Sequence, residues 1–218
     1  MTIAVEIDNI IRDNNSQALK YFIKDYDPSF DEDSADLNCT SLIDELPFTS
    51  KEGKKYFKEL DYPYELFGCA RTISKHIHVE LSDWLDEHED VKVIYFSTNT
   101  SDLIIQSTYF FLSKGSRVKT VMFLDDPKNI WEFCDIAITI NKDVVDSKPN
   151  NKQVIVIAKS DNKNLQEKAD TIYNTFHDFL IDKPFDAKIL KSAVKKTSIK
   201  NKIFNLPIKF RLPWMNQK

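Results

Sequence analysis

Residues 3–13, IAVEIDNIIRD, form an apolar run that passes into two acids one residue apart. The run Ile3–Val5 has the composition of a buried strand. In an extended chain, Glu6 and Asp8 point to the same side. Ligands bind beyond the carboxyl ends of strands in open α/β sheets. We therefore predict a first parallel strand that brings both carboxylates to a binding site, although a buried strand also ends in acids by chance.

Four later segments have the same form, an apolar run followed by small polar or charged residues. Helix-like stretches separate them, and residues 102–113 (DLIIQSTYFFLS) are the clearest of these. Strands that alternate with helices predict an α/β fold with a parallel sheet. The predicted strands are residues 91–96 (VKVIYF), 117–124 (RVKTVMFL), 135–138 (DIAI) and 153–158 (QVIVIA).

The opening stretch resembles the first motif of the haloacid-dehalogenase (HAD) superfamily, most closely its 5'(3')-deoxyribonucleotidase-like branch, apolar-Asp-x-Asp-Gly-x-Leu-Arg-Asp. Arg12 and Asp13 match this motif, while Glu6 and Asn9 depart from it. The resemblance implies a Rossmannoid parallel sheet with a small helical cap insert. It also implies that Glu6 stands at the nucleophile and Asp8 at the acid that protonates the leaving group. The extra methylene of Glu6 displaces its carboxylate by roughly 1 Å, which can cost on the order of a hundredfold in rate. Asn9 replaces a glycine, and Asn tolerates left-handed backbone.

The same resemblance assigns phosphate-binding residues. Ser97 is the better match to the hydroxyl that binds the phosphate, with Thr98 as the alternative, and Lys128 matches the lysine of the third motif. Hydroxyls that follow a strand are also common helix N-caps, so either side chain can instead begin the helix predicted at residues 102–113.

The fourth motif of the family, an acidic pair that holds magnesium, has no counterpart. The strand that should end in it runs into Thr139 and Ile140, and the pair at residues 125–126 comes one strand too early. Magnesium is usually bound through one or two carboxylates. The sequence therefore predicts a degenerate site without a cofactor. If the site is active, Glu6 and Asp8 would coordinate Mg²⁺, with Asp135 or Asp143 as a further ligand.

An insert at about residues 14–80 stands where the family carries its cap. Five aromatic side chains crowd its second half, and we favour packing of the cap over stacking on a base as their role. They are Tyr56, Phe57, Tyr62, Tyr64 and Phe67. The pattern ELFGCA at residues 65–70 resembles HAD-like proteins of large tailed bacteriophages, including the crAss-like group.

The composition suits one domain, predicted at residues 1–185, with an added segment. A chain of 218 residues with 42% hydrophobic residues can bury a full α/β core. Its three cysteines lack Cys-x-x-Cys spacing, which predicts free thiols and argues against a zinc site. No apolar stretch of 18 residues occurs, so we expect neither a membrane span nor a membrane partner.

Residues 186–218 form a basic segment that we interpret as a docking arm. It carries nine Lys or Arg residues and one acid, a formal charge of +8, which leaves −12 for residues 1–185 of the total −4. Pro207 and Pro213 oppose a regular helix and favour an extended arm. We expect protein subunits as partners. Nucleic acid is less favoured because the arm holds many large aliphatic residues. The predicted contact residues are Phe204, Phe210, Arg211 and Trp214.

These patterns predict a non-catalytic HAD-like protein for interaction or assembly. In its sharpest form it is a phage virion or tail component, made in the host cytoplasm and not secreted. The alternative is a magnesium-dependent phosphatase or 5'-nucleotidase acting on (deoxy)nucleoside monophosphates. A third possibility is a sensor that binds a phosphate compound without turnover.

Overall fold

A computed structural model describes residues 1–118 and 120–182. The predicted arm and its contact residues, Phe204, Phe210, Arg211 and Trp214, lie outside the described residues.

The core is a six-stranded sheet in which every pairing is parallel. Its strand order is β3-β2-β1-β4-β5-β6, so the chain moves outward in one direction from β1 and then returns to pair β4 on the other side of it. The point where the order reverses, between β1 and β4, is where open α/β sheets bind ligands. The strands are β1 (Thr2–Glu6), β2 (Lys92–Ser97), β3 (Val121–Phe123), β4 (Ile136–Thr139), β5 (Gln153–Ile157) and β6 (Thr171–Tyr173).

Helices cover the sheet because most strand side chains are apolar on both faces. On one face, Ala4, Phe96 and Val154 belong to an apolar cluster with side chains of η4 (Pro127–Glu132), α6 (Lys142–Asp146) and α7 (Lys163–Gln166). Elsewhere α4 (Ile77–Glu87) packs on α8 (Phe176–Asp182), with ring centroids of Trp84 and Phe179 at 5.8 Å.

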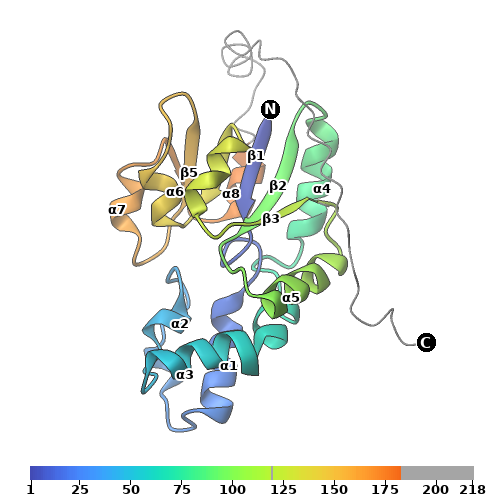
Figure 1. Cartoon of the computed structure of the whole chain (residues 1–218). Helices are drawn as coiled ribbons and strands as arrows, with labels where there is room; N and C mark the ends of the chain where they lie inside the picture. The colour runs from blue at the N-terminus through green and yellow to red at the C-terminus, as the bar shows by residue number, and fades with distance from the viewer. Residues whose placement is uncertain (119, 183–218) are drawn as a thin grey trace, which may run out of the picture. The chain divides into compact units, whose positions relative to one another are not determined.

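A helical cap follows β1 and lies beyond the carboxyl ends of the strands (Figure 1). It has its own apolar core, which includes Phe22, Leu42, Phe57 and Leu66. Two of its turns, η2 and η3, are π-helical, a geometry that is frequent at functional sites. The cap elements are α1 (Asn14–Asp25), η1 (Glu32–Ser34), α2 (Leu42–Glu45), α3 (Lys51–Tyr56), η2 (Phe57–Asp61) and η3 (Tyr64–Gly68).

The junction between the cap and the core is α5 (Asp102–Ser113), which packs against η3 at Gly68. A Cβ on Gly68 would lie 3.3 Å from the carbonyl oxygen of Ser107 and 3.1 Å from the Tyr64 ring. Glycine therefore permits this close approach between the two segments.

The structure confirms the α/β class, the parallel sheet and the helix predicted at residues 102–113. The strand predicted at residues 117–124 is shorter, Val121–Phe123, and β6 was not predicted. The three cysteines are free thiols, as expected. Within residues 1–118 and 120–182, no helix is long and apolar enough to cross a membrane.

Candidate functional site

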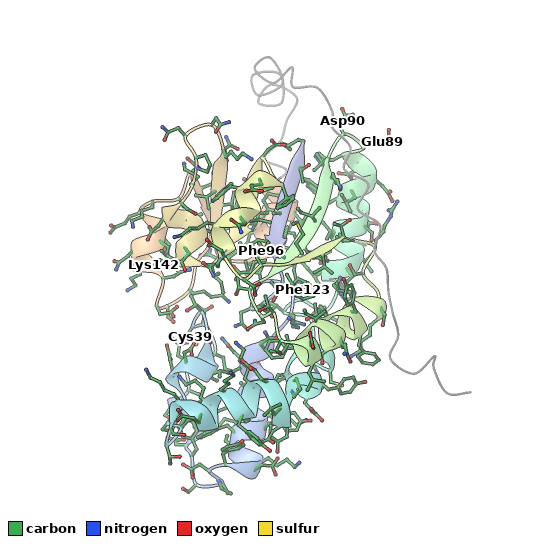
Figure 2. All side chains as sticks on the ribbon, in the orientation of Figure 1. Cys39, Glu89, Asp90, Phe96, Phe123 and Lys142 are labelled. Carbon is green, nitrogen blue, oxygen red and sulfur yellow. The ribbon has the colours of Figure 1, made fainter. Side chains whose placement is uncertain are left out.

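A cavity of about 540 Å³ opens where the strands β1, β2 and β4 end and the cap begins. Glu6 and Asp8 line it from the core, and Thr40 and Ser41 line it from the cap. Figure 2 marks this junction with Lys142 on the core side and Cys39 on the cap side. The two acids of the opening motif therefore face one space at the sheet's switch point, as the sequence predicted.

The loop after β1 folds back on itself and brings Arg12 beside Asp8. The carbonyl oxygen of Ile7 accepts hydrogen bonds from the backbone N–H groups of Ile11 (3.0 Å) and Arg12 (3.0 Å). Asn9 allows this turn with a φ of 56°, a left-handed conformation that Asn adopts more readily than most residues.

Asn9 also does what a glycine in its place could not do. Its Oδ1 accepts hydrogen bonds from the backbone N–H groups of Asn14 (3.1 Å) and Asn15 (3.2 Å), at the start of α1. Its Nδ2 donates to the carbonyl oxygen of Thr40 at 2.9 Å. The Asn9 side chain therefore fastens the loop to two parts of the cap.

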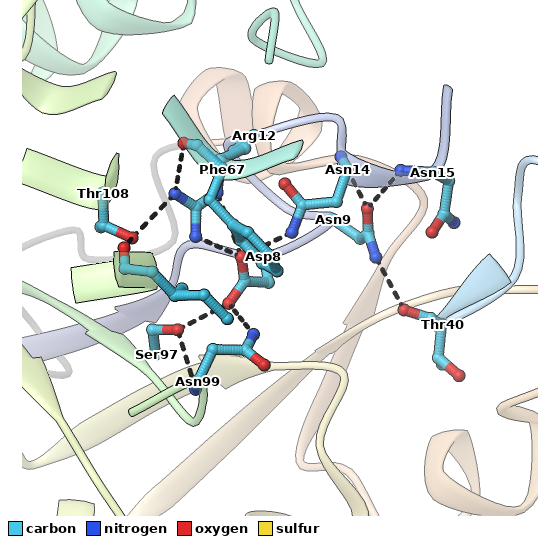
Figure 3. Close-up of polar contacts among 11 residues, drawn as sticks. Asp8, Asn9, Arg12, Asn14, Asn15, Thr40, Phe67, Ser97, Asn99 and Thr108 are labelled. Atoms are coloured by element: carbon cyan, nitrogen blue, oxygen red, sulfur yellow. Dashed lines mark hydrogen bonds and ion pairs between the residues drawn. The ribbon is translucent and has the colours of Figure 1, made fainter. Parts of the chain in front are cut away.

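Asp8 is held by hydrogen bonds to both of its carboxylate oxygens (Figure 3). Oδ1 accepts from Arg12 through Nε (3.1 Å) and Nη2 (2.5 Å), and from Asn14 Nδ2 (2.6 Å). Oδ2 accepts from Ser97 Oγ (2.6 Å) and Asn99 Nδ2 (2.9 Å). This carboxylate has no oxygen left without a protein partner.

Arg12 is 0% exposed, so its ion pair with Asp8 is buried. Its Nη1 donates to the carbonyl oxygen of Phe67 (2.7 Å) and to Thr108 Oγ1 (2.9 Å), which ties the pair to η3 and α5. Burial by itself would raise the pKa of Asp8, but the charge of Arg12 and the donated hydrogen bonds lower it to about 2. Asp8 is therefore ionised throughout the physiological range.

Glu6 has the opposite electrostatic environment. Its Oε2 accepts hydrogen bonds from Thr139 Oγ1 (2.5 Å) and the Ile140 N–H (2.9 Å), across the switch point from β1 to β4. Burial raises the pKa of Glu6 to about 7, with a further contribution from the charge of Asp8, although hydrogen bonds from Thr139, Ile140 and Asn141 act to lower it. The hydrogen bonds from Thr139 and Ile140 reach the same oxygen, and the Asn141 N–H adds a third contact to this carboxyl group.

The predicted phosphate-binding residues lie in different environments. Ser97 is 0% exposed, and its Oγ donates to Asp8 and accepts from the Asn99 N–H (3.2 Å). It does not cap the following helix, whose N-cap residue is Ser101. Thr98 lines the cavity, whereas Lys128 is exposed in η4 and is not among the residues that line the cavity.

The magnesium ion that the resemblance implies does not fit these side chains. Asp8 has both oxygens engaged, and the β4 end supplies Thr139 and Ile140 in place of carboxylates. Asp135 cannot replace them, because it accepts from the Thr2 N–H (2.8 Å) at the amino end of β1, and Asp143 is not among the cavity-lining residues. Within the described ranges, no group of three or more His, Cys, Asp or Glu side chains is arranged to hold a metal ion.

Several residues of the site were not predicted from the sequence. The cap loop closes on the core through Thr40, whose Oγ1 (2.5 Å) and N–H (3.0 Å) donate to Asp161 in the loop after β5. Lys58 of η2 and Lys142 of α6 also line the cavity. The acid after β5 and the lysine after β4 follow apolar strands, which is a usable signal, but nothing in the cap sequence distinguishes Lys58.

The aromatic residues of the insert mostly pack the cap, as favoured from the sequence. Phe57 is buried and Tyr62 packs against the same cluster, while Tyr56 and Tyr64 are exposed. Phe67 alone among the five lines the cavity, and its ring also lies 4.9 Å from the Arg12 guanidinium carbon.

Comparison of the sequence with protein-family models and with curated proteins finds no match.

Proposed function

We propose that this chain is a non-catalytic protein of the HAD type, which acts through what it binds and not through turnover. The strand order, the acids that end β1 and the cap that follows them support the HAD assignment. The hydrogen-bonding of Asp8 supports the loss of catalysis and is the observation that carries the proposal.

Neither acid suits the role that the HAD resemblance gives it. An acid that protonates a leaving group needs a pKa near the working pH. The pKa of Asp8 is instead about 2, because the charge of Arg12 and the hydrogen bonds from Ser97 and Asn14 stabilise its ionised form. The carboxylate of Glu6 is directed toward β4 by Thr139 and Ile140, and one of its oxygens is occupied there. In this arrangement Asp8 serves as the counter-ion of Arg12.

We further propose that the protein works in an assembly, with residues 186–218 as the docking arm. The formal charge of +8 on this segment, against −12 on residues 1–185, supports attraction between the arm of one subunit and the body of another. A virion or tail component of a phage is the most specific form of this proposal. Sedimentation of the full chain, with Phe210→Asp and Trp214→Asp as variants, tests it. Unchanged self-association and partner binding in both variants would contradict the role of the arm.

The proposed loss of catalysis is tested with the purified full chain, magnesium, deoxynucleoside monophosphates and an aryl phosphate. We expect no hydrolysis above that of the buffer, and no heat of magnesium binding in calorimetry. A Glu6→Asp, Thr139→Asp double variant restores the two missing aspartates of the HAD motifs. Turnover by this variant would mean that the pocket is otherwise intact. Hydrolysis by the wild-type chain that disappears in Glu6→Gln would overturn the proposal, because that activity would come from this site.

A further inference from the structure

Most charged side chains around the cavity already have partners within the protein. In the three ion pairs the charges compensate each other, and both carboxylate oxygens of Asp161 accept hydrogen bonds from Thr40, so these side chains have little capacity left for a ligand. The pairs are Asp8 with Arg12 (2.5 Å), Asp161 with the Thr40 hydroxyl (2.5 Å), Lys168 with Asp146 (2.5 Å) and Asp44 with Lys54 (3.4 Å).

Three charged side chains that line the cavity remain. The ammonium groups of Lys58 and Lys142 form no hydrogen bond or ion pair within residues 1–118 and 120–182, although the charge of Lys142 acts on nearby Asp146. The hydrogen bonds to Glu6 from Thr139 and Ile140 both use Oε2, which leaves Oε1 with capacity for a ligand donor. A ligand of this cavity therefore meets one carboxyl group, which can accept a hydrogen bond, and two ammonium groups, which can donate.

These three groups lie at different places around the cavity. Glu6 is 5% exposed at the end of the central strand β1, which places its carboxyl group at the deep end. Lys142 is exposed at the first residue of α6, and Figure 2 labels it on the core side of the junction. Lys58 is half-buried on η2 of the cap. The deep end is therefore acidic, while the basic groups come from the two outer walls.

This polarity determines how a charged ligand would be oriented. An anionic group placed beside Glu6 would meet the carboxylate of Asp8 and, above about pH 7, that of Glu6 as well, and like charges at short range repel. The positive charge of Arg12 is already directed to Asp8. An ammonium group at the deep end would instead find the free oxygen of Glu6, and charge-assisted hydrogen bonds of this kind are among the stronger ones.

We propose that the cavity binds a small zwitterion, with its ammonium group on Glu6 and its anionic group, a phosphate or carboxylate, between Lys58 and Lys142. A cavity of about 540 Å³ is within the usual range for small-molecule sites, so a metabolite of this class fits. The inference rests on the proposed function, since it describes a ligand that is retained without turnover.

The test uses calorimetric titration of the full chain with three probes at pH 8, where the Glu6 carboxyl, with its pKa of about 7, is mostly ionised. O-phosphoethanolamine carries both charged ends, ethyl phosphate lacks the ammonium group, and ethanolamine lacks the phosphate. We expect O-phosphoethanolamine to bind at least roughly tenfold more tightly than either of the others, as expected for one charge-assisted hydrogen bond in a buried site. Glu6→Gln preserves the shape of the side chain. In this variant O-phosphoethanolamine and ethyl phosphate should bind with about equal affinity.

A second set of variants tests whether Lys142 binds the phosphate group. Lys142→Met should weaken binding of both phosphate probes by a similar factor, roughly two- to fivefold for an exposed charge, and leave their ratio unchanged. Lys163→Met, an exposed lysine of α7 outside the cavity lining, is the control and should leave all affinities unchanged.

Equal or tighter binding of ethyl phosphate, or no binding of any probe to the wild-type chain, would overturn this inference. Both results leave the proposed loss of catalysis intact, because that proposal does not depend on which ligand the cavity holds. Hydrolysis of O-phosphoethanolamine in the same samples would overturn both.

Discussion

Replacing Asp8 by Asn should strongly destabilise the protein, although the side chain keeps its size. The change removes the only acid that contacts Arg12 among the described residues, and it leaves a guanidinium group that is 0% exposed without a counter-ion. Breaking a buried ion pair on one side costs about 3–5 kcal/mol. The NH₂ group of the new amide would also face hydrogen-bond donors in either orientation. These are Arg12 and Asn14 on one side, and Ser97 and Asn99 on the other. We therefore expect the free energy of unfolding to fall by about 3–5 kcal/mol in urea titrations followed by circular dichroism.

The chain offers a matched control for this experiment. Arg117 and Asp86 form an ion pair at 2.6 Å, close to the 2.5 Å of the buried pair, but their side chains are 54% and 61% exposed. Asp86→Asn should change the unfolding free energy by less than about 1 kcal/mol. The Asp8→Asn, Arg12→Met double variant should lose less than the sum of the two single losses, because it leaves no unpaired buried charge. A loss below about 1 kcal/mol in Asp8→Asn would refute the account of Asp8 as a counter-ion, since catalytic acids are commonly replaced at little cost in stability.

Three further predictions concern the carboxyl of Glu6, the junction at Gly68 and the closed cap loop. The pKa of Glu6 is raised by burial from 4.5 to about 7 on folding. The contribution of Glu6 to the free energy of unfolding is therefore fully present below pH 4.5 and is lost as the pH rises through 7. Between pH 4.5 and 7, the free energy of unfolding of the wild type in urea should therefore fall by on the order of 3 kcal/mol relative to that of Glu6→Gln. If the two proteins show the same dependence on pH, the raised pKa of Glu6 is contradicted. Gly68→Ala should lower the unfolding free energy by about 1–3 kcal/mol in thermal melts, because its Cβ would lie 3.3 Å from a backbone oxygen. Gly115→Ala, whose Cβ has its nearest neighbour at 3.6 Å, is the control, and equal losses in the two variants would refute the packing argument. Thr40→Val removes the 2.5 Å hydrogen bond to Asp161 and should speed hydrogen exchange of the cap-loop amides by roughly fivefold or more, whereas unchanged exchange would mean that this contact does not hold the loop.

The central strands were predictable because they are buried on both faces. Apolar runs such as VKVIYF need to be covered on both sides, so their composition alone identifies them. The edge strand β6 was missed for the converse reason. Thr171 and Ile172 are exposed there, and three residues are too few for a periodic pattern.

The two acids of the site were predictable, but their chemistry was not. The spacing of Glu6 and Asp8 placed both side chains in one space, which the structure confirms. The role of Arg12 depends on a left-handed turn at Asn9 that folds the chain back within four residues. The positions of Lys58 and Thr40 depend on how the cap packs against the core, because these residues meet the core only through tertiary contacts.

The most direct test of the account is a titration of the Asp8 and Glu6 side-chain carboxyls by carbon-13 NMR on the wild-type chain. We expect Asp8 to remain ionised down to about pH 2 and Glu6 to take up its proton near pH 7. An Asp8 carboxyl that titrates above pH 5 would contradict the account, because an acid of that strength can protonate a leaving group.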